Sequence, residues 1–241
     1  EFSDIPTRNT RMKDLPVYER FHSWQGEGVH MGKSAFFIRL HGCPVHCSWC
    51  DSAGTWHPDH LPEEVERLAP DELAEEAFSS GCEIVVITGG EPAIHNLHDL
   101  AFQLRNRNLP VHLETCGAYP IRGEMDWITL SPKWNAMPID ECLAQTDEFK
   151  LIVENPDDVR KWSEELPLSQ TGAPVWLHPE WSKSKDQAVL GSINQWVKDH
   201  GAPYRAGFQL HKLFEVDEED ERSQPVRALS HLPGQETPGE S

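Results

Sequence analysis

The sequence predicts an α/β fold, an open and partial βα barrel of about six to seven mostly parallel strands. Short apolar runs alternate at close spacing with amphipathic segments, which favours parallel βα units joined by right-handed crossovers. Seven such runs are too few for a closed eight-stranded barrel. Polar and glycine-containing motifs follow directly after the apolar runs, at the carboxyl edge where folds of this kind build their active sites.

The predicted strands are short apolar segments that end at glycine, proline or a polar pair. In chain order they cover Ala35–Leu40, Glu83–Thr88, Val111–Thr115, Trp127–Leu130, Phe149–Val153, Val175–His178 and Ala206–Leu210. The first ends at His41-Gly42, the second at Gly89-Gly90 and the fourth at Ser131-Pro132, dipeptides that interrupt a strand.

Four predicted helices lie between these strands, over Asp71–Ser80, Ile94–Arg107, Asp157–Glu165 and Gln187–His200. Pro70 and Asp71 are typical of a first helical turn, and Gly81 is typical of the residue that ends a helix. The second helix has apolar residues at helical spacing, so one of its faces can pack on a sheet. The sequence shows no internal repeat and no interior linker.

Composition limits the class of protein. The chain has 241 residues, 38% of them hydrophobic, and a formal net charge of −19. No apolar stretch approaches the roughly 20 residues that cross a bilayer, so we expect no membrane span. The negative charge disfavours binding to nucleic acid or to an anionic membrane. Six cysteines without an apolar leader segment indicate a reducing compartment, and we expect a cytoplasmic protein.

We expect two regions, a folded domain over residues 12–214 and an acidic, disordered tail over residues 215–241. The chain begins with Glu1-Phe2, and Met12 is the expected native start. The tail begins with a dense acidic run and continues with many Pro, Gly, Ser and Glu residues. A charge run of this kind is usually solvated, although its composition also leaves a partner-binding role open.

The most informative motif is C-P-V-H-C-S-W-C, which places Cys43, Cys47 and Cys50 on the loop after the first predicted strand. Thiolates hold iron–sulfur clusters, and three protein ligands leave one iron of a four-iron cluster open. That iron can bind S-adenosylmethionine (SAM). The spacing C-x3-C-x2-C, with an aromatic residue before the last cysteine, is typical of radical SAM enzymes.

Other uses of these cysteines fit the sequence less well. Structural zinc sites favour paired C-x2-C knuckles, and no second knuckle exists because Cys82, Cys116 and Cys142 are isolated. A disulfide framework would need a secreted context. Bacterial ferredoxins space their first three cysteines as C-x2-C-x2-C, which is a different pattern.

Two further motifs suggest ligand contacts. Thr88-Gly89-Gly90-Glu91-Pro92 follows the second strand, where two glycines allow close backbone approach and a carboxylate can accept an ammonium group. After a three-cysteine loop this motif resembles the segment that binds the amino group of SAM. Arg39 lies inside an apolar strand, where it serves either as a structural salt bridge or as a clamp for a substrate carboxylate.

Taken together, the motifs S-W-Q-G-E-G, F-I-R-L-H-G-C, C-x-W-C-D-S, T-G-G-E-P, E-T-C-G, S-P-K and Q-L-H-K occur in this order between Val17 and Phe214. In this order the sequence resembles the 7-carboxy-7-deazaguanine synthase (QueE) family of radical SAM enzymes. The resemblance implies cluster ligation by Cys43, Cys47 and Cys50. It implies SAM binding by Trp49, Asp51, Gly90, Thr115, Ser131, Pro132 and Lys133. It implies substrate binding by Trp24, Gln25, Gly26, Arg39 and Thr88, and Mg²⁺ ligation by Ser52.

The resemblance also implies an activity. Members convert 6-carboxy-5,6,7,8-tetrahydropterin to 7-carboxy-7-deazaguanine with loss of ammonia, in queuosine and deazapurine biosynthesis. We therefore expect a 4Fe-4S cluster, SAM and Mg²⁺ as cofactors, a reductant such as flavodoxin or ferredoxin, and a homodimer. One alternative is a radical SAM activase that makes a glycyl radical on a partner protein. A second is a non-catalytic metal-binding or electron-transfer protein, in which G-G-E-P and S-P-K would have no purpose.

This sequence departs from the family pattern at three places. Cys116 stands where members often have asparagine, and we interpret it as a small core thiol rather than a redox residue. His178-Pro179 replaces a commoner Gln-Pro, so no substrate contact is assigned there. The chain continues past the Q-L-H-K segment, so no contact is assigned to Asp217.

Overall fold

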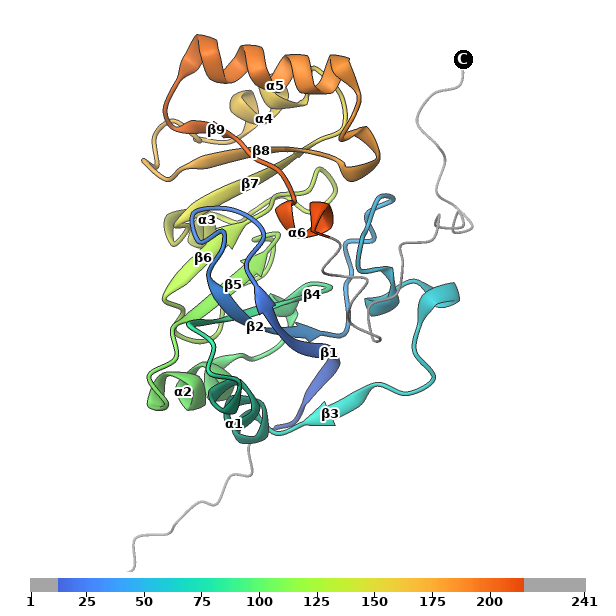
Figure 1. Ribbon diagram of the computed structural model, residues 1–241, viewed down its shortest axis with the longest axis vertical. Helices are drawn as coiled ribbons and strands as arrows, with labels where there is room; N and C mark the ends of the chain where they lie inside the picture. Colours follow the sequence, from blue (N-terminus) through green and yellow to red (C-terminus); the bar gives the residue numbers. More distant parts are fainter. Residues whose placement is uncertain (1–12, 215–241) are drawn as a thin grey trace, which may run out of the picture.

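The computed structural model describes residues 13–214, which form one sheet of nine strands in the order β3-β1-β2-β4-β5-β6-β7-β8-β9 (Figure 1). The strands are β1 (Leu15–Trp24), β2 (Ser34–Leu40), β3 (Glu66–Leu68), β4 (Ile84–Gly89), β5 (Val111–Thr115), β6 (Trp127–Leu130), β7 (Glu148–Val153), β8 (Val175–Pro179) and β9 (Tyr204–Ala206).

The predicted open, mostly parallel sheet is confirmed. Every neighbouring pair from β2 through β9 is parallel, whereas β1 pairs antiparallel with β2, and β3 pairs antiparallel with β1. The two ends of the strand order, β3 and β9, do not pair with each other within the described residues, so the sheet stays open. Parallel strands place all their carboxyl ends at one edge, and this arrangement gathers the motifs.

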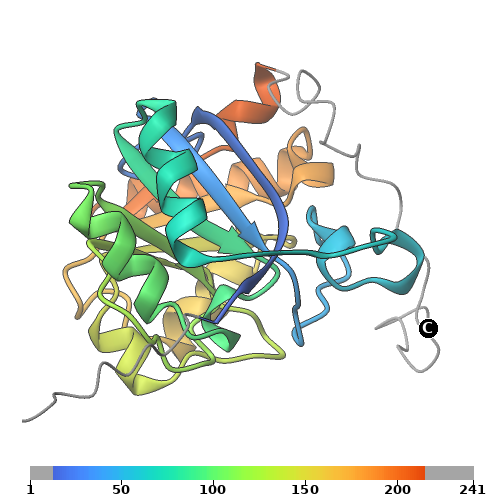
Figure 2. The same cartoon turned by 90° about the horizontal axis from the view of Figure 1, so that it is seen from below.

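Six α-helices follow the strands: α1 (Pro70–Ser80), α2 (His98–Asn106), α3 (Asp140–Ala144), α4 (Asp158–Glu165), α5 (Gln187–His200) and α6 (Leu210–Leu213). Helices α1 and α2 lie side by side, as both views show (Figures 1 and 2). Helices α4 and α5 pack together near β8 and β9 at the other end of the sheet (Figure 1). None of the described helices is long and apolar enough to cross a membrane.

Two apolar cores hold the helices on the sheet. In the first, Leu73 of α1 and Leu100 of α2 are fully buried in a cluster with residues of β1, β2, β4 and β5. In the second, Trp162 of α4 and Ile193 of α5 pack in a cluster with residues of β7 and β8. Burying one such side chain contributes about 1.5–3 kcal/mol, so these cores rather than helix propensity fix the elements.

The sequence analysis missed two strands. Strand β1 contains Glu19 and Arg20 and lies near the sheet's edge, so only two of its ten residues are fully buried and the apolar signal is weak. Strand β3 has three residues, and none of them is fully buried. Both pairings come from the tertiary fold rather than from a local pattern.

Two predicted boundaries are wrong. The last strand ends at Ala206 instead of continuing to Leu210: the Gly207 amide makes the last bond to β8, at the Leu177 carbonyl (2.9 Å), and the Leu210 amide donates to the Gly26 carbonyl (3.1 Å) instead of to the sheet. Helix α2 begins at His98, and Pro92–Ile94 is a separate 3-10 turn. The short helices α3 and α6 were not predicted. The expected start at Met12 and the expected acidic tail lie outside the described residues.

Candidate active site

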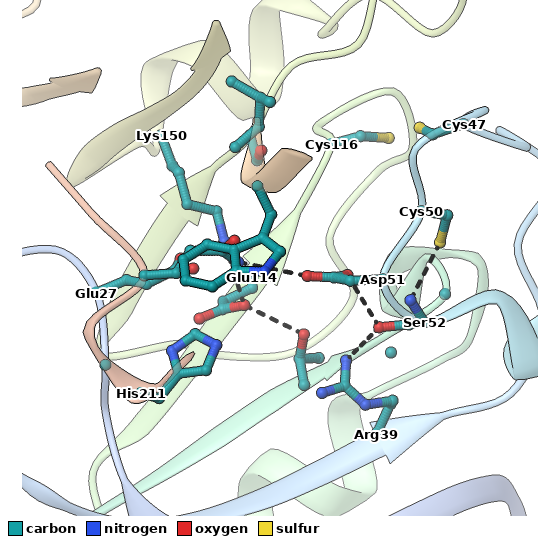
Figure 3. Close-up of a pocket in the computed structure, with 18 of the residues that line it drawn as sticks. Glu27, Arg39, Cys47, Cys50, Asp51, Ser52, Glu114, Cys116, Lys150 and His211 are labelled. Atoms are coloured by element: carbon teal, nitrogen blue, oxygen red, sulfur yellow. Dashed lines mark hydrogen bonds and ion pairs between the residues drawn. The ribbon is translucent and has the colours of Figure 1, made fainter. Parts of the chain in front are cut away.

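A cavity of about 220 Å³ opens at the carboxyl edge of the parallel strands. Its walls come from the loops or strand ends after β1, β2, β4, β5, β6, β7 and β8, and from the segment around α6. The close-up shows Cys47 and Cys50 on one side of this space and Lys150 and Glu27 on the other (Figure 3). The structure therefore brings motifs that are spread over the whole chain into one site.

The three cysteines of the C-x3-C-x2-C run share this cavity. Cys43, Cys47 and Cys50 are free thiols, partly exposed, and all three line the wall. Two backbone bonds fix the start of their loop: Gly42 donates to the Thr55 carbonyl and accepts from the Glu91 amide, both at 2.9 Å. The loop is thus held between its own far end and the segment after β4.

The surroundings of these sulfurs suit ligation of a cluster. Burial raises the pKa of Cys47 to about 12, with Lys133 acting in the opposite direction, so the thiolate forms only when a strong positive charge binds. Backbone N–H groups point at the sulfurs, including the Ser52 amide at 3.4 Å from Cys50 Sγ. Three thiols with inward N–H donors in one cavity are a donor set that fits an iron–sulfur cluster with one open iron.

The two glycines after β4 pack against the cysteine loop. A side chain on Gly90 would lie 2.3 Å from the Gly42 carbonyl oxygen and 2.7 Å from Cys43 Cβ. One on Gly89 would lie 2.2 Å from the Leu40 carbonyl oxygen, at a φ of +145° that disfavours other residues. These two glycines therefore allow the end of β4 to pack closely against the backbone that leads into the cysteine loop.

Glu91 lines the cavity and also has a structural role at the ends of two strands. Its buried carboxylate accepts hydrogen bonds from Thr115 Oγ1 (2.5 Å), the Cys116 amide (2.8 Å) and the Ala93 amide (3.0 Å). These bonds join the ends of β4 and β5 under the cavity. Since both oxygens are already used, an ammonium contact would be additional to this structural role.

The turn after β6 places a cation beside the cysteines. Lys133 Nζ donates to the carbonyl (2.6 Å) and hydroxyl (2.8 Å) oxygens of Ser131 and lies 5.5 Å from the centre of the Trp49 ring. Burial lowers the pKa of Lys133, an effect that the neighbouring Cys47 partly offsets. Trp49 thus forms one wall next to Cys47 together with Ser131 and Lys133, which are distant from it in sequence.

Arg39 forms the structural salt bridge that the sequence left open, and its guanidinium also lines the cavity. Its Nε pairs with Glu19 Oε1 at 2.6 Å, which is the structural salt bridge, and its Nη1 donates to Ser52 Oγ at 2.9 Å. The guanidinium nevertheless lines the cavity, with 21% of the side chain exposed. Glu19 therefore orients a cation that remains available to an anionic group in the cavity (Figure 3).

Another wall of the cavity is a buried network of charged side chains. None of these side chains was expected in the site from the sequence. Lys150 Nζ lies 2.6 Å from Glu27 Oε2 and 3.8 Å from Glu114 Oε2. Glu114 also accepts from Gln25 Nε2 (3.1 Å) and Thr88 Oγ1 (3.2 Å). Burial alone would lower the pKa of Lys150, but the two carboxylates reverse this and raise it, so the amine stays protonated.

The motifs gave partial signals for this network. Glu27 and Glu114 lie inside the motifs S-W-Q-G-E-G and E-T-C-G. Each carboxylate is therefore next to residues that the motifs assign to substrate or SAM binding, and this was a signal for a role in the site. Lys150 lies in the apolar run of β7 without any motif. A lysine inside a buried strand needs a charged partner, so its position alone indicated a buried ion pair.

Helix α6 closes the cavity with the Q-L-H-K segment. The Leu210 amide donates to the Gly26 carbonyl (3.1 Å), and Lys212 Nζ lies 3.6 Å from Asp51 Oδ2. A side chain on Gly26 would lie 2.2 Å from the His211 ring, which explains why the loop has glycine there. The helix thus connects the loop after β1 with the residue after the last cysteine.

Cys116 also lines the cavity, although the sequence suggested a core position. It is 6% exposed, and burial, with Glu91 nearby, raises the pKa of its thiol. In the close-up its side chain is on the same side as Cys47 (Figure 3). It is therefore a small protonated thiol in the wall, whereas Cys82 and Cys142 are buried away from the cavity.

Comparisons with known proteins agree with this site. Residues 37–150 match the model of the radical SAM superfamily. The chain is 42% identical over 202 residues to the 7-carboxy-7-deazaguanine synthase of Synechocystis sp., covering 83% of this chain and 93% of that protein. The corresponding values for the 7-carboxy-7-deazaguanine synthase of Prochlorococcus marinus are 39% over 229 residues, 84% and 98%.

A solved structure gives the same result. The crystal structure of QueE from Escherichia coli matches with a TM-score of 0.71 at 28% identity, covering 86% of this chain and all of that chain. This chain belongs to the radical SAM superfamily and, within it, to the family of 7-carboxy-7-deazaguanine synthases.

Proposed function

We propose that this enzyme, a carbon–nitrogen lyase, converts 6-carboxy-5,6,7,8-tetrahydropterin to 7-carboxy-7-deazaguanine with loss of ammonia, in queuosine and deazapurine biosynthesis. The observation that carries the proposal is the cavity itself: three thiols and an oriented guanidinium face one space, in a chain of this family. The family implies a 4Fe-4S cluster and SAM.

The cysteines and the walls next to them would hold these cofactors. Cys43, Cys47 and Cys50 supply three ligands, and Trp49, Asp51, Gly90, Thr115, Ser131, Pro132 and Lys133 are the proposed SAM-binding residues, most of which line the cavity. When bound, the cluster and SAM supply a 5′-deoxyadenosyl radical that removes a hydrogen atom from the substrate. The protein's part is to position the two partners and to exclude water.

The opposite wall suits a small carboxylated heterocycle. Arg39, held by Glu19, is the proposed partner of the substrate carboxylate. Glu114 can accept N–H groups of the ring, and Thr88 and Gln25 hold this carboxylate in place. Trp24 and Gly26 complete the proposed substrate site, which α6 covers. These contacts would fix the carbon that loses hydrogen in front of the SAM-binding wall.

Mg²⁺ is a further proposal. Ser52 Oγ faces the cavity region beside Arg39, and Asp51 is the carboxylate next to it in the chain. One hydroxyl is a poor magnesium site, and residues 13–214 contain no group of three His, Cys, Asp or Glu side chains that could share a single metal ion. The protein therefore fits Mg²⁺ only where substrate oxygens and water complete the coordination.

We also propose the wider setting. Residues 12–214 would form the radical SAM domain, the protein would act as a cytoplasmic homodimer, and flavodoxin or ferredoxin would supply electrons. The reducing compartment follows from the six free cysteines. The negative charge of the chain supports a small-molecule substrate over nucleic acid.

The activase alternative is not favoured. Activases act on a segment of a partner protein, whereas this cavity is small and α6 covers it. The curated relatives that match over most of the chain are synthases.

An anaerobic assay tests the proposal. Reconstituted enzyme, a one-electron reductant, SAM and the carboxylated pterin should yield one ammonia for each 7-carboxy-7-deazaguanine, measured by mass spectrometry and ammonia analysis. Omission of SAM is the control. Cleavage of SAM without conversion of the pterin, at any substrate concentration, would contradict the proposed substrate while retaining radical SAM chemistry.

A further inference from the structure

The loop that holds the cluster cysteines turns back on itself through a tryptophan. After Cys50 the chain forms a 3-10 turn over Ala53–Thr55, and Trp56 directly follows it. The turn is closed by the Thr55 amide and hydroxyl, which both donate to the Ser52 carbonyl (3.0 and 2.7 Å). This geometry returns the Trp56 side chain towards the cysteines.

The Trp56 ring is fixed by aromatic neighbours. It stacks on His46, which lies between Cys43 and Cys47, with ring centres 4.4 Å apart and planes 16° apart. The ring of His57 meets it edge-on at 5.1 Å. A ring held on two sides by the loop itself has one orientation, so its single N–H points in a defined direction.

The Trp56 indole N–H is buried and has no hydrogen-bond acceptor at normal bonding geometry within residues 13–214. An indole N–H can only donate, and leaving a buried donor unpaired costs about 1–3 kcal/mol. Among its neighbours is the Cys50 sulfur: Trp56 favours the thiolate of Cys50, although burial of Cys50 is the larger effect and raises its pKa overall. The Ser52 amide approaches the same sulfur at 3.4 Å.

We infer that Trp56 is a positioning residue for the cluster, donating its indole N–H to the Cys50 sulfur when the cluster is bound. The inference rests on the proposed 4Fe-4S site. Hydrogen bonds to ligand sulfurs are one of the factors that set cluster potentials. Reduction adds negative charge to the cluster, and a fixed N–H dipole stabilises that charge most strongly where water is excluded. Trp56 therefore raises the reduction potential and makes electron delivery easier.

The variant Trp56→Phe removes the N–H and keeps a ring that can stack on His46. The control is Trp127→Phe, which removes another buried, unpartnered indole N–H, at the start of β6 against His30 and away from the cavity. Redox titration monitored by electron paramagnetic resonance should give a more negative midpoint potential for Trp56→Phe and an unchanged one for Trp127→Phe. Iron analysis checks that each variant holds four irons.

The outcomes separate this inference from the proposed function. If the wild type binds no four-iron cluster, the proposed function itself fails. The role of Trp56 is overturned if Trp56→Phe has the same midpoint potential as the wild type. It is also overturned if Trp127→Phe shifts the midpoint potential as much as Trp56→Phe does. If Trp56→Phe holds no cluster, ¹⁵N-tryptophan protein in a Trp49→Phe background decides. An indole nitrogen coupling to the reduced cluster supports the contact, and its absence overturns it.

Discussion

Single thiols in this protein differ by what surrounds them. Cys43, Cys47 and Cys50 share a loop and line the cavity, whereas Cys82 and Cys142 are buried away from it and donate weakly to backbone carbonyls of Ala77 and Tyr119. Identical side chains thus have different roles because position decides whether a sulfur can reach a cluster.

The first prediction concerns these thiols. Alanine at any of the three loop cysteines should abolish SAM cleavage and lose most of the iron, because two ligands cannot hold a cubane cluster firmly. Cys82→Ala and Cys142→Ala should retain most of the cluster, and so should Cys116→Ala, which removes only a small protonated thiol from the wall. Iron analysis and the visible charge-transfer band measure this. Full cluster and activity in Cys47→Ala would disprove the ligand assignment.

Arg39 allows a sharper test because its structural and binding contacts can be separated. Arg39→Lys should raise the KM for the pterin about tenfold, equivalent to ~1.4 kcal/mol, since lysine lacks the planar fork that binds a carboxylate. The Kd for SAM should change little. Glu19→Gln is the matched control, because it removes the 2.6 Å salt bridge and keeps the guanidinium. An equal loss of thermal stability in both variants with no change in KM would favour a purely structural role.

Ser52 tests the metal proposal. Ser52→Ala should reduce turnover several-fold in Mg²⁺ and leave iron content and SAM binding unchanged, because one oxygen ligand is removed from a sparse site. The variant also loses the 2.9 Å bond from Arg39, so turnover must be followed as Mg²⁺ is varied. Turnover that does not depend on Mg²⁺ in either protein would show that the metal assignment is wrong.

Among the elements, α6 has few core contacts but covers the cavity. The strand expected over Ala206–Leu210 would have made this segment essential for folding, but β9 is complete at Ala206. A chain ending at Phe208 keeps β9 and loses the Leu210–Gly26 and Lys212–Asp51 contacts. The closure of the site, rather than the sheet, depends on α6.

Truncation of the chain tests the role of α6. The chain that ends at Phe208 should keep its melting temperature within a few degrees and lose turnover by at least tenfold, because water enters the site and substrate contacts are missing. The control ends at Ser223 and should retain nearly full turnover, as the composition of the removed segment predicts. Circular dichroism and the pterin assay measure the two effects. Global unfolding of the shorter chain would mean that α6 supports the sheet.

Over the whole molecule, buried histidines make stability depend on pH. Burial lowers the pKa of both His112 and His178 to about 4, below the usual value of about 6.5. As the pH falls from 6.5 towards 4, these two histidines therefore become protonated in the unfolded chain before they do so in the folded protein. Stability from these groups is present above pH 6.5 and is lost through this window, by at most about 1.4 kcal/mol per pH unit for each histidine.

This gives a prediction for His178→Gln. Between pH 6.5 and 5 the variant should lose about 1–2 kcal/mol less of its unfolding free energy than wild type, because glutamine does not titrate. Anaerobic urea unfolding at several pH values measures the slope. His98→Gln, a substitution at an exposed position, is the control and should leave the slope unchanged. Parallel slopes for wild type and His178→Gln would show that His178 is not the titrating group.

The sequence by itself determined the features that depend on near neighbours. Three cysteines within eight residues define a ligand loop wherever it lies, and apolar runs that end at glycine, proline or a polar pair define the parallel strands β2 and β4 to β8. The order of the motifs along the chain was enough to indicate the family. These signals are local because ligand spacing and strand periodicity are properties of consecutive residues.

Only the tertiary structure decided which charged groups meet. Glu27 and Lys150 are 123 residues apart and pair at 2.6 Å, and Lys212 reaches Asp51 across the cavity. Strand β1, the end of β9 and the covering helix α6 likewise depend on distant partners. A buried charge is tolerated only beside its partner, and that partner is chosen by the packing of strands rather than by the sequence around either residue.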